Sequence, residues 1–126
     1  MVKQNYGSII NISSIYGITS PNHDIYKNNP ISQPISYSVT KSGIISLTRY
    51  LATLWAKNGV RVNSISPGGV FNYQNDDFIN EYCIRSPIGR MADEDEINGS
   101  ILYLASSASK YVTGHNLVVD GGWTCW

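Results

Sequence analysis

Three short runs of β-branched residues alternate with two longer stretches of helical periodicity along this 126-residue chain. The runs cover residues 7–14, 60–66 and 116–120, and small polar residues or glycines close each of them. Strand, helix, strand, helix, strand is the order that gives parallel pairing through helical crossovers, so the sequence predicts an α/β sheet with flanking helices. About three strands make half of a doubly wound, Rossmann-like parallel sheet.

The two predicted helices span residues 37–57 and 93–106. In the first, apolar residues recur at three- and four-residue steps, at Ile44, Leu47, Leu51, Leu54 and Trp55. Asn58-Gly59 predicts its end. In the second, acidic residues stand in the first turn, where the helix dipole favours them. For residues 71–87, which are polar with scattered aromatic side chains, we expect a lid or a short irregular helix.

A long loop, residues 15–36, separates the first predicted strand from the first predicted helix. It is rich in Pro, Asn, Ser and Tyr. Loops of this length in compact domains are usually functional or mobile, and we expect one of these two roles for this loop.

Composition argues against several classes of partner. Nine basic and nine acidic residues are mixed along the chain, so no basic run offers a footprint for nucleic acid or an anionic membrane. Cys83 and Cys125 lack metal-ligand spacing, and we expect no metal site, no disulfide and a reducing, cytoplasmic environment. No apolar run approaches the length of a membrane span. A small-molecule partner is the remaining expectation.

Tyr37 and Lys41 stand four residues apart at the start of a predicted helix, so their side chains share a face. A phenol with the ordinary tyrosine pKa of about 10 is a poor base near neutral pH. An ammonium about 5 Å away, at an effective dielectric constant of about 20, stabilises a phenolate by roughly 3 kcal/mol, which is enough for acid–base work. Ser14, at the end of the first predicted strand, could hydrogen-bond the reacting oxygen. The same spacing also fits an ordinary surface pair.

The chain resembles the short-chain dehydrogenase/reductase family through five motifs in the family's order. They are GSIINISS (7–14), YSVTK (37–41), RVNSISPGGV (61–70), PIGRM (87–91) and YVTGHNLVVDGG (111–122). The resemblance implies an oxidoreductase that transfers hydride between NAD or NADP and a carbonyl or alcohol. It also implies that residues 1–126 form a single partial domain, the C-terminal half of the family's Rossmann-like fold.

Roles follow residue by residue from this resemblance. Tyr37 would be the proton donor or acceptor, and Lys41 would support its ionisation and bind the nicotinamide ribose. Ser14 would position the reacting oxygen, with Ser13 as the alternative. Backbone groups of the next loop would face the nicotinamide carboxamide, and these belong to Pro67, Gly68, Gly69 and Val70. Asn72 stands where many members have a threonine that touches the cofactor, and Asp120-Gly121-Gly122 would be structural.

Two departures from the family pattern stand out. No GxxxGxG or GxGxxG occurs in this sequence, so it offers no site for the adenosine and pyrophosphate of the cofactor. The stretch from Ser14 to Tyr37 is longer than usual, with residues 22–30 as the apparent insertion. This insertion would line a sugar-like substrate or form an ordinary surface loop. The aromatic residues Tyr16, Phe71 and Tyr73 could wall the pocket.

The motif arrangement is similar to the subset found in bacterial flagellin-modification and surface-sugar biosynthesis clusters. Three functions stay open: an oxidoreductase active within a longer parent, an inactive truncated fragment or subunit-pairing remnant, and a sugar-nucleotide epimerase or dehydratase. The short C-terminus argues against the last. Without a neighbour, the first strand would expose a flat apolar edge, which is an aggregation hazard. The helix over residues 37–57 resembles the family's dimer-forming helix, so the parent is expected to be a homo-oligomer.

Overall fold

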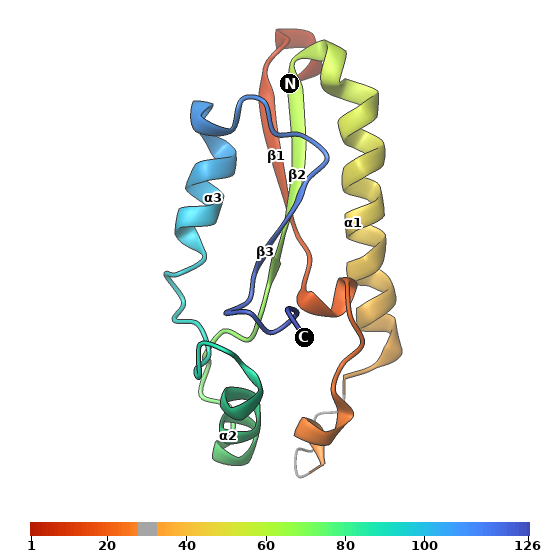
Figure 1. The fold of residues 1–126 in the computed structure, drawn as a ribbon. Coiled ribbons are helices and arrows are strands. Elements are labelled where there is room, and N and C mark those ends of the chain that lie inside the picture. The colour runs from red at the N-terminus through yellow and green to blue at the C-terminus, as the bar shows by residue number, and fades with distance from the viewer. Residues whose placement is uncertain (28–32) are drawn as a thin grey trace.

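The computed structural model of the chain describes residues 1–27 and 33–126. Three strands and three α-helices make up the regular structure of this part, in the order β1, α1, β2, α2, α3 and β3 (Figure 1). Their bounds are Gly7–Ile12 for β1, Ile35–Trp55 for α1, Val60–Pro67 for β2, Asp76–Arg85 for α2, Asn98–Ala105 for α3 and Asn116–Val119 for β3. The predicted α/β class is confirmed.

The sheet is entirely parallel, with β2 between β1 and β3. Gly7 lies opposite Val60 and Ile12 opposite Ile65, while Ser64 pairs with Asn116 on the other side. Because all strands run in one direction, their carboxyl ends meet at one edge. Figure 1 shows α1 on one face of the sheet, α3 on the opposite face, and α2 beyond the carboxyl ends. That edge is where ligands bind in open α/β sheets.

The buried face of α1 differs from the predicted one. Ile45, Thr48 and Ala52 are buried against the sheet, whereas Leu47 and Leu54 of the predicted stripe are about half exposed, at 48% and 52%. The reason is that α1 carries apolar residues on more than one side, and only one of these sides packs against the sheet. Thr48, which the apolar pattern had excluded, is satisfied there because its hydroxyl donates to Ile44 O and accepts from the Asn11 amide.

The ends of α1 are set by backbone chemistry at both sides. Pro34 occupies the N-cap, so α1 begins at Ile35, two residues earlier than predicted. A short 3-10 turn, Ala56–Asn58, follows its last residue. Gly59 then adopts a left-handed φ of 69°, and a Cβ there would meet Asn5 O at 2.3 Å. The predicted stop at Asn58-Gly59 is confirmed.

Arg61 on β2 holds α3 against the sheet. Its guanidinium donates to Leu104 O at 2.9 Å, to Ser106 O at 3.2 Å and to Ser109 Oγ at 2.9 Å. These carbonyls belong to the end of α3, where backbone acceptors lack partners within the helix and the helix dipole favours a cation. Ser8 on β1 also donates to Leu104 O at 2.8 Å. A charged side chain thus joins α3 to the sheet.

The second predicted helix is shorter than expected. Turns occupy residues 94–97, and α3 begins only at Asn98 with no acidic residue in its first turn, so the prediction of a helix from residue 93 was wrong. The cause is a competing local contact. The Glu96 carboxylate receives the Arg90 guanidinium at 2.6 and 2.7 Å and also accepts from the Asp93 N–H. This binding holds the segment in turns.

Residues 71–87 contain a regular helix rather than an irregular one. α2 is capped by Asn75, whose side chain accepts from Phe78 N at 2.8 Å, and two aspartates stand in its first turn. The predicted loop over residues 15–36 contains two 3-10 turns, η2 (Ile15–Gly17) and η3 (His23–Tyr26). Residues 28–30 of the apparent insertion lie outside the described residues.

β1 has one paired edge among the described residues, the one toward β2. Its isoleucines are only partly covered, and Ile12 is 45% exposed. This is the open apolar edge that the sequence predicts. None of the helices in the described part of the chain is long and apolar enough to cross a membrane.

The Arg90–Glu96 pair predicts a specific acid sensitivity. Hydrogen bonds from Arg90 and from the Asp93 N–H hold the pKa of Glu96 at about 2, below its ordinary value of 4.5. Since the folded-state pKa is the lower one, the contribution is complete above pH 4.5 and is lost as pH falls toward 2. We expect Glu96→Gln to lower the urea midpoint at pH 7 and to converge with wild type near pH 2.5. Glu94→Gln removes the same charge nearby and is the control. The difference between its urea midpoint and that of wild type should not shrink in this way as the pH falls.

Candidate active site at the carboxyl edge of the sheet

Two reciprocal hydrogen bonds join the end of β1 to the first turns of α1. Ser13 Oγ donates to Lys41 O at 2.7 Å, and Lys41 Nζ donates to Ile12 O at 3.1 Å. Gly17 lies against the same point, because a Cβ there would meet the Lys41 carbonyl carbon and oxygen at 2.8 Å. The chain therefore needs a glycine at position 17 for α1 to approach the strand end.

Tyr37 and Lys41 occupy successive turns of α1, as their spacing predicts. Lys41 Nζ lies 5.5 Å from the centroid of the Tyr37 ring. At this distance the ammonium lies within range of a cation–π contact with the ring. Tyr37 remains 36% exposed, so its ring is accessible.

The two serines after β1 have different surroundings. Ser13 Oγ is engaged with the backbone of α1, as described above. Ser14 Oγ accepts a hydrogen bond from Tyr16 N at 3.2 Å and retains its own proton for another acceptor. Ser14 and Tyr37 line one cavity of about 240 Å³, and Lys41 lies beside Tyr37. The structure thus brings the three candidate catalytic residues together.

The loop after β2 forms the facing side of this cavity through Gly68, Gly69 and Val70. Gly68 N donates to Val119 O at 2.9 Å, and Gly69 N donates to the Tyr82 hydroxyl at 2.6 Å. Both N–H groups therefore already have hydrogen-bond acceptors within the chain. The Val70 N–H has no hydrogen-bond partner among the described residues.

Several residues of the cavity were missed by sequence reasoning. Tyr82 and Phe78, four apart on α2, are two of them. The others are Ile15, Tyr26, Gln33, Gln74 and Met91. The four-residue spacing of Phe78 and Tyr82 on one helix face was the available signal. Of the three predicted wall residues only Tyr16 lines the cavity. Phe71 and Tyr73 pack on each other 5.3 Å apart and are 42% and 89% exposed.

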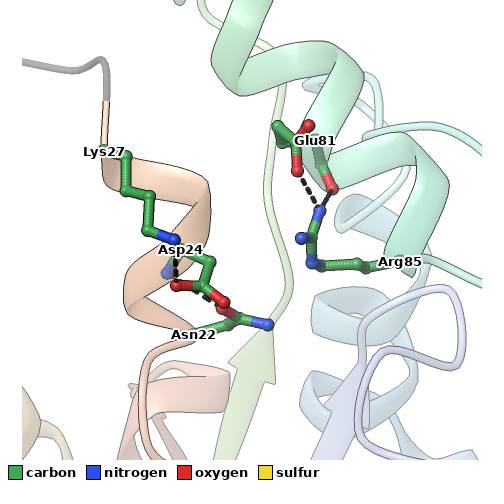
Figure 2. A network of polar contacts seen from close by, with 5 residues as sticks. All are labelled: Asn22, Asp24, Lys27, Glu81 and Arg85. Carbon is green, nitrogen blue, oxygen red and sulfur yellow. Dashed lines mark hydrogen bonds and ion pairs between the residues drawn. The ribbon is translucent and has the colours of Figure 1, made fainter.

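The far side of the cavity is formed by η3 and α2, which lie side by side (Figure 2). Asp24 and Lys27 pair within η3 at 2.9 Å, and Glu81 pairs with Arg85 within α2. Lys27 is the main cause of a lowered Asp24 pKa, and Arg85 across the gap contributes to it. These pairs are on the surface, so we assign them little stabilisation.

Three tyrosines around the cavity are held in the neutral form. Burial is the largest cause that raises the pKa of Tyr16, and its hydrogen bond to Tyr26 adds to the effect. Burial likewise raises the pKa of Tyr26 and Tyr82. These hydroxyls therefore act as hydrogen-bonding groups rather than bases at neutral pH. Among the described residues, no cluster of three or more His, Cys, Asp or Glu side chains could hold a metal ion.

The chain has a parallel sheet with helices on both faces, and a serine, a tyrosine and a lysine lie together at the carboxyl edge of that sheet. This arrangement places the chain among the Rossmann-like α/β proteins. A family model described as enoyl-(acyl carrier protein) reductase matches residues 1–124. The chain belongs to the short-chain dehydrogenase/reductase family.

Curated relatives extend this comparison. The chain is 40% identical over 121 residues to post-translational flagellin modification protein A of Campylobacter coli, covering 96% of this chain and 47% of that one. It is 45% identical over 128 residues to a ribulose-forming D-arabinitol 2-dehydrogenase of Candida albicans, covering 95% and 43%. The predicted similarity to the flagellin-modification subset is confirmed.

Solved structures agree with the fold. A short-chain dehydrogenase from Leptospira borgpetersenii with bound NAD+ superposes with a TM-score of 0.91 at 44% identity, covering 98% of this chain and 47% of that one. A gluconate 5-dehydrogenase from Burkholderia cenocepacia, in complex with NADP and tartrate, gives 0.84 at 30% identity, covering 99% and 48%. The chain spans slightly less than half the length of each of these relatives.

The close approach of Gly17 to α1 predicts opposite effects for two glycine substitutions. Gly17→Ala places a methyl group against the Lys41 backbone, and we expect it to lower the free energy of unfolding by about 1–3 kcal/mol. Gly43→Ala, on the exposed side of α1 with no atom within 4 Å, should raise it by roughly 0.5–1 kcal/mol. Urea unfolding of both variants checks this. Equal effects would contradict a special fit at Gly17.

Proposed function

We propose that residues 1–126 are the C-terminal half of a longer NAD(P)-dependent oxidoreductase that interconverts a secondary alcohol and a ketone on a sugar-related substrate. The observation that carries the proposal is the gathering of Ser14, Tyr37 and Lys41 opposite the loop that ends at Val70, around one cavity. The family membership and the dehydrogenases among the relatives support it.

The described residues fit the nicotinamide end of such a cofactor. Tyr37 and the backbone of the loop after β2 line the same space, and the Val70 N–H has no partner within the described chain. NAD or NADP would supply the hydride acceptor or donor when bound. Lys41, beside Tyr37, is suitably placed for a ribose hydroxyl.

The chain's own residues would handle the proton. During oxidation the Tyr37 side-chain oxygen would accept the proton of the substrate hydroxyl, and a bound NAD or NADP would be the acceptor for the hydride from the same carbon. Ser14 Oγ donates a hydrogen bond to the reacting oxygen. The Lys41 ammonium, fixed by Ile12 O, stabilises the negative phenolate electrostatically.

Catalysis in this proposal belongs to the longer protein, and residues 1–126 alone would be inactive. The chain covers 43–47% of the two curated relatives described above. The open edge of β1 is where further strands of the parent sheet would pair, and they would bring the phosphate-binding loop. The alternative, a remnant that only pairs with another subunit, shares this edge and would lack turnover in any assembly.

Oligomer and location follow as further parts of the proposal. Leu47, Tyr50 and Leu54 form an exposed stripe on α1, which would be covered in a homo-oligomer of the parent. Cys83 and Cys125 are free thiols, as expected in a reducing cytoplasm.

Tyr37→Phe tests the catalytic assignment in the full-length protein. We expect turnover to fall by about 10²- to 10⁴-fold, since the general acid–base is removed, while the NAD(H) or NADP(H) dissociation constant stays within about twofold. Tyr111→Phe, at a fully exposed tyrosine, is the matched control and should be unchanged. Wild-type turnover in Tyr37→Phe would refute the assignment.

Calorimetry on the 126-residue chain tests whether cofactor binding requires the other half of the proposed longer protein. We expect no micromolar binding of NADH or NADPH, because the pyrophosphate has no Gly-rich loop in this sequence. Circular dichroism on the same sample reports whether the chain is folded. Micromolar binding by a folded chain would overturn the proposal that this half is inactive alone.

A further inference from the structure

The outer side of the cavity carries a row of hydrogen-bonding groups that the proton transfer does not use. The Tyr16 and Tyr26 hydroxyl oxygens lie 2.8 Å apart, and the Gln33 side chain hydrogen-bonds the Tyr26 hydroxyl. All three residues line the same cavity as Ser14 and Tyr37. A substrate bound at Tyr37 would therefore have these groups within the same open cavity.

Ring contacts hold the two tyrosines of this row in place. The Tyr16 ring packs edge-on against the Tyr37 ring, with centroids 6.4 Å apart and planes at 79°. The Tyr26 ring lies 5.3 Å from that of Phe78 on α2, and its neighbour Ile25 is buried in the core. Tyr16 therefore connects the reacting tyrosine to Tyr26, and α2 supports Tyr26 from the other side. Fixed hydroxyls of this kind suit recognition of a fixed substrate hydroxyl.

The two phenols have hydrogen-bonding capacity left for a ligand. Each has one proton and acceptor lone pairs. Their mutual bond uses one of the two protons, and the Gln33 side chain, whose hydrogen bond lowers the Tyr26 pKa, donates to Tyr26 and so uses a lone pair rather than the other proton. Burial keeps both neutral, as their raised pKa values show. The pair can thus donate to and accept from an alcohol, which itself does both.

The cavity wall is uncharged. Every residue described as lining it is apolar or neutral and polar. A carboxylate beside Tyr16, Tyr26 or Gln33 would lose hydration and meet no cation among the lining residues, since the Lys41 ammonium lies beside Tyr37 and donates to Ile12 O. Burying an unpaired charge is costly. A neutral hydroxyl would exchange hydrogen bonds with water for bonds to Tyr16, Tyr26 or Gln33 at little cost. The wall therefore favours an uncharged polyhydroxylated molecule over a sugar acid.

We propose that Tyr26, with Tyr16, is a specificity-determining pair that binds a hydroxyl away from the reacting carbon and selects a neutral polyol or its ketose over a sugar acid. This inference rests on the proposed function, which it deepens. Tyr26 comes from η3, within the stretch that makes the segment between Ser14 and Tyr37 unusually long. The apparent insertion would thus serve to bring a hydroxyl into the cavity.

The test compares substrates in the full-length protein with NAD or NADP. D-arabinitol and galactitol are the neutral polyols, D-gluconate is the sugar acid, and 2-butanol is a secondary alcohol with no second hydroxyl. The variants are Tyr26→Phe and Tyr16→Phe, with Tyr111→Phe as the matched control. Cofactor affinity, measured on each variant, establishes that it is folded.

We expect wild type to prefer at least one polyol to D-gluconate. Tyr26→Phe and Tyr16→Phe should each lower kcat/KM for that polyol by about 5- to 10-fold, mainly through KM, as loss of one neutral hydrogen bond predicts. Turnover of 2-butanol should fall by clearly less than this in both variants, and Tyr111→Phe should match wild type with every substrate. An equal loss for the polyol and 2-butanol, no loss for the polyol, or a preference for D-gluconate would each overturn the inference.

The two proposals fail in different ways. If wild type oxidises an alcohol but Tyr26→Phe does not discriminate, the specificity pair is refuted and the proposed oxidoreductase stands. If wild type oxidises none of the alcohols and reduces none of their ketones with either cofactor, the proposed function fails and the specificity pair fails with it.

Discussion

The site depends on the contact between the end of β1 and the first turns of α1. Two hydrogen bonds run in opposite directions between the segments, from the Ser13 side chain to the Lys41 backbone and from the Lys41 side chain to the Ile12 backbone. In each, a side chain of one segment donates to a main-chain carbonyl of the other, so the two bonds together set the relative position of Ser14 and Tyr37. This contact gives the Lys41 ammonium two neighbours: it donates a hydrogen bond to the Ile12 carbonyl on the sheet, and it lies over the Tyr37 ring on the preceding turn of the helix.

Local pattern was sufficient for much of this architecture. The alternation of apolar runs and helical periods predicts the parallel sheet, and the four-residue step from Tyr37 to Lys41 predicts their shared face. The buried side of α1 was not predictable in this way. Both of its sides are apolar, and only the sheet decides that Thr48 is buried while Leu47 is exposed. The start of α3 escaped prediction for a similar reason, because the Arg90–Glu96 contact outweighs the dipole preference of the acidic residues.

The walls of the cavity were the least accessible to sequence reasoning. Tyr26 and Phe78 lie 52 positions apart and meet only because η3 and α2 pack beside each other (Figure 2). In a chain with nine tyrosines, composition gives no means of choosing the ones that converge. Tyr73, a natural candidate by its nearness to the loop at Val70, is directed to the surface instead.

A ten-residue helix, α2, takes part in both halves of the cavity. Its Tyr82 hydroxyl accepts the Gly69 N–H, and the same ring stacks on Trp123 at 4.3 Å, while Phe78 one turn earlier supports Tyr26. The position of the Gly69 loop and the position of the Tyr26 side chain therefore both depend on α2. Under the proposed function, a replacement on this helix that adapts the pocket to a new substrate would also disturb the loop proposed to receive the nicotinamide, so such changes would be epistatic. A lineage that switches substrates would have to alter both surfaces of α2 in concert.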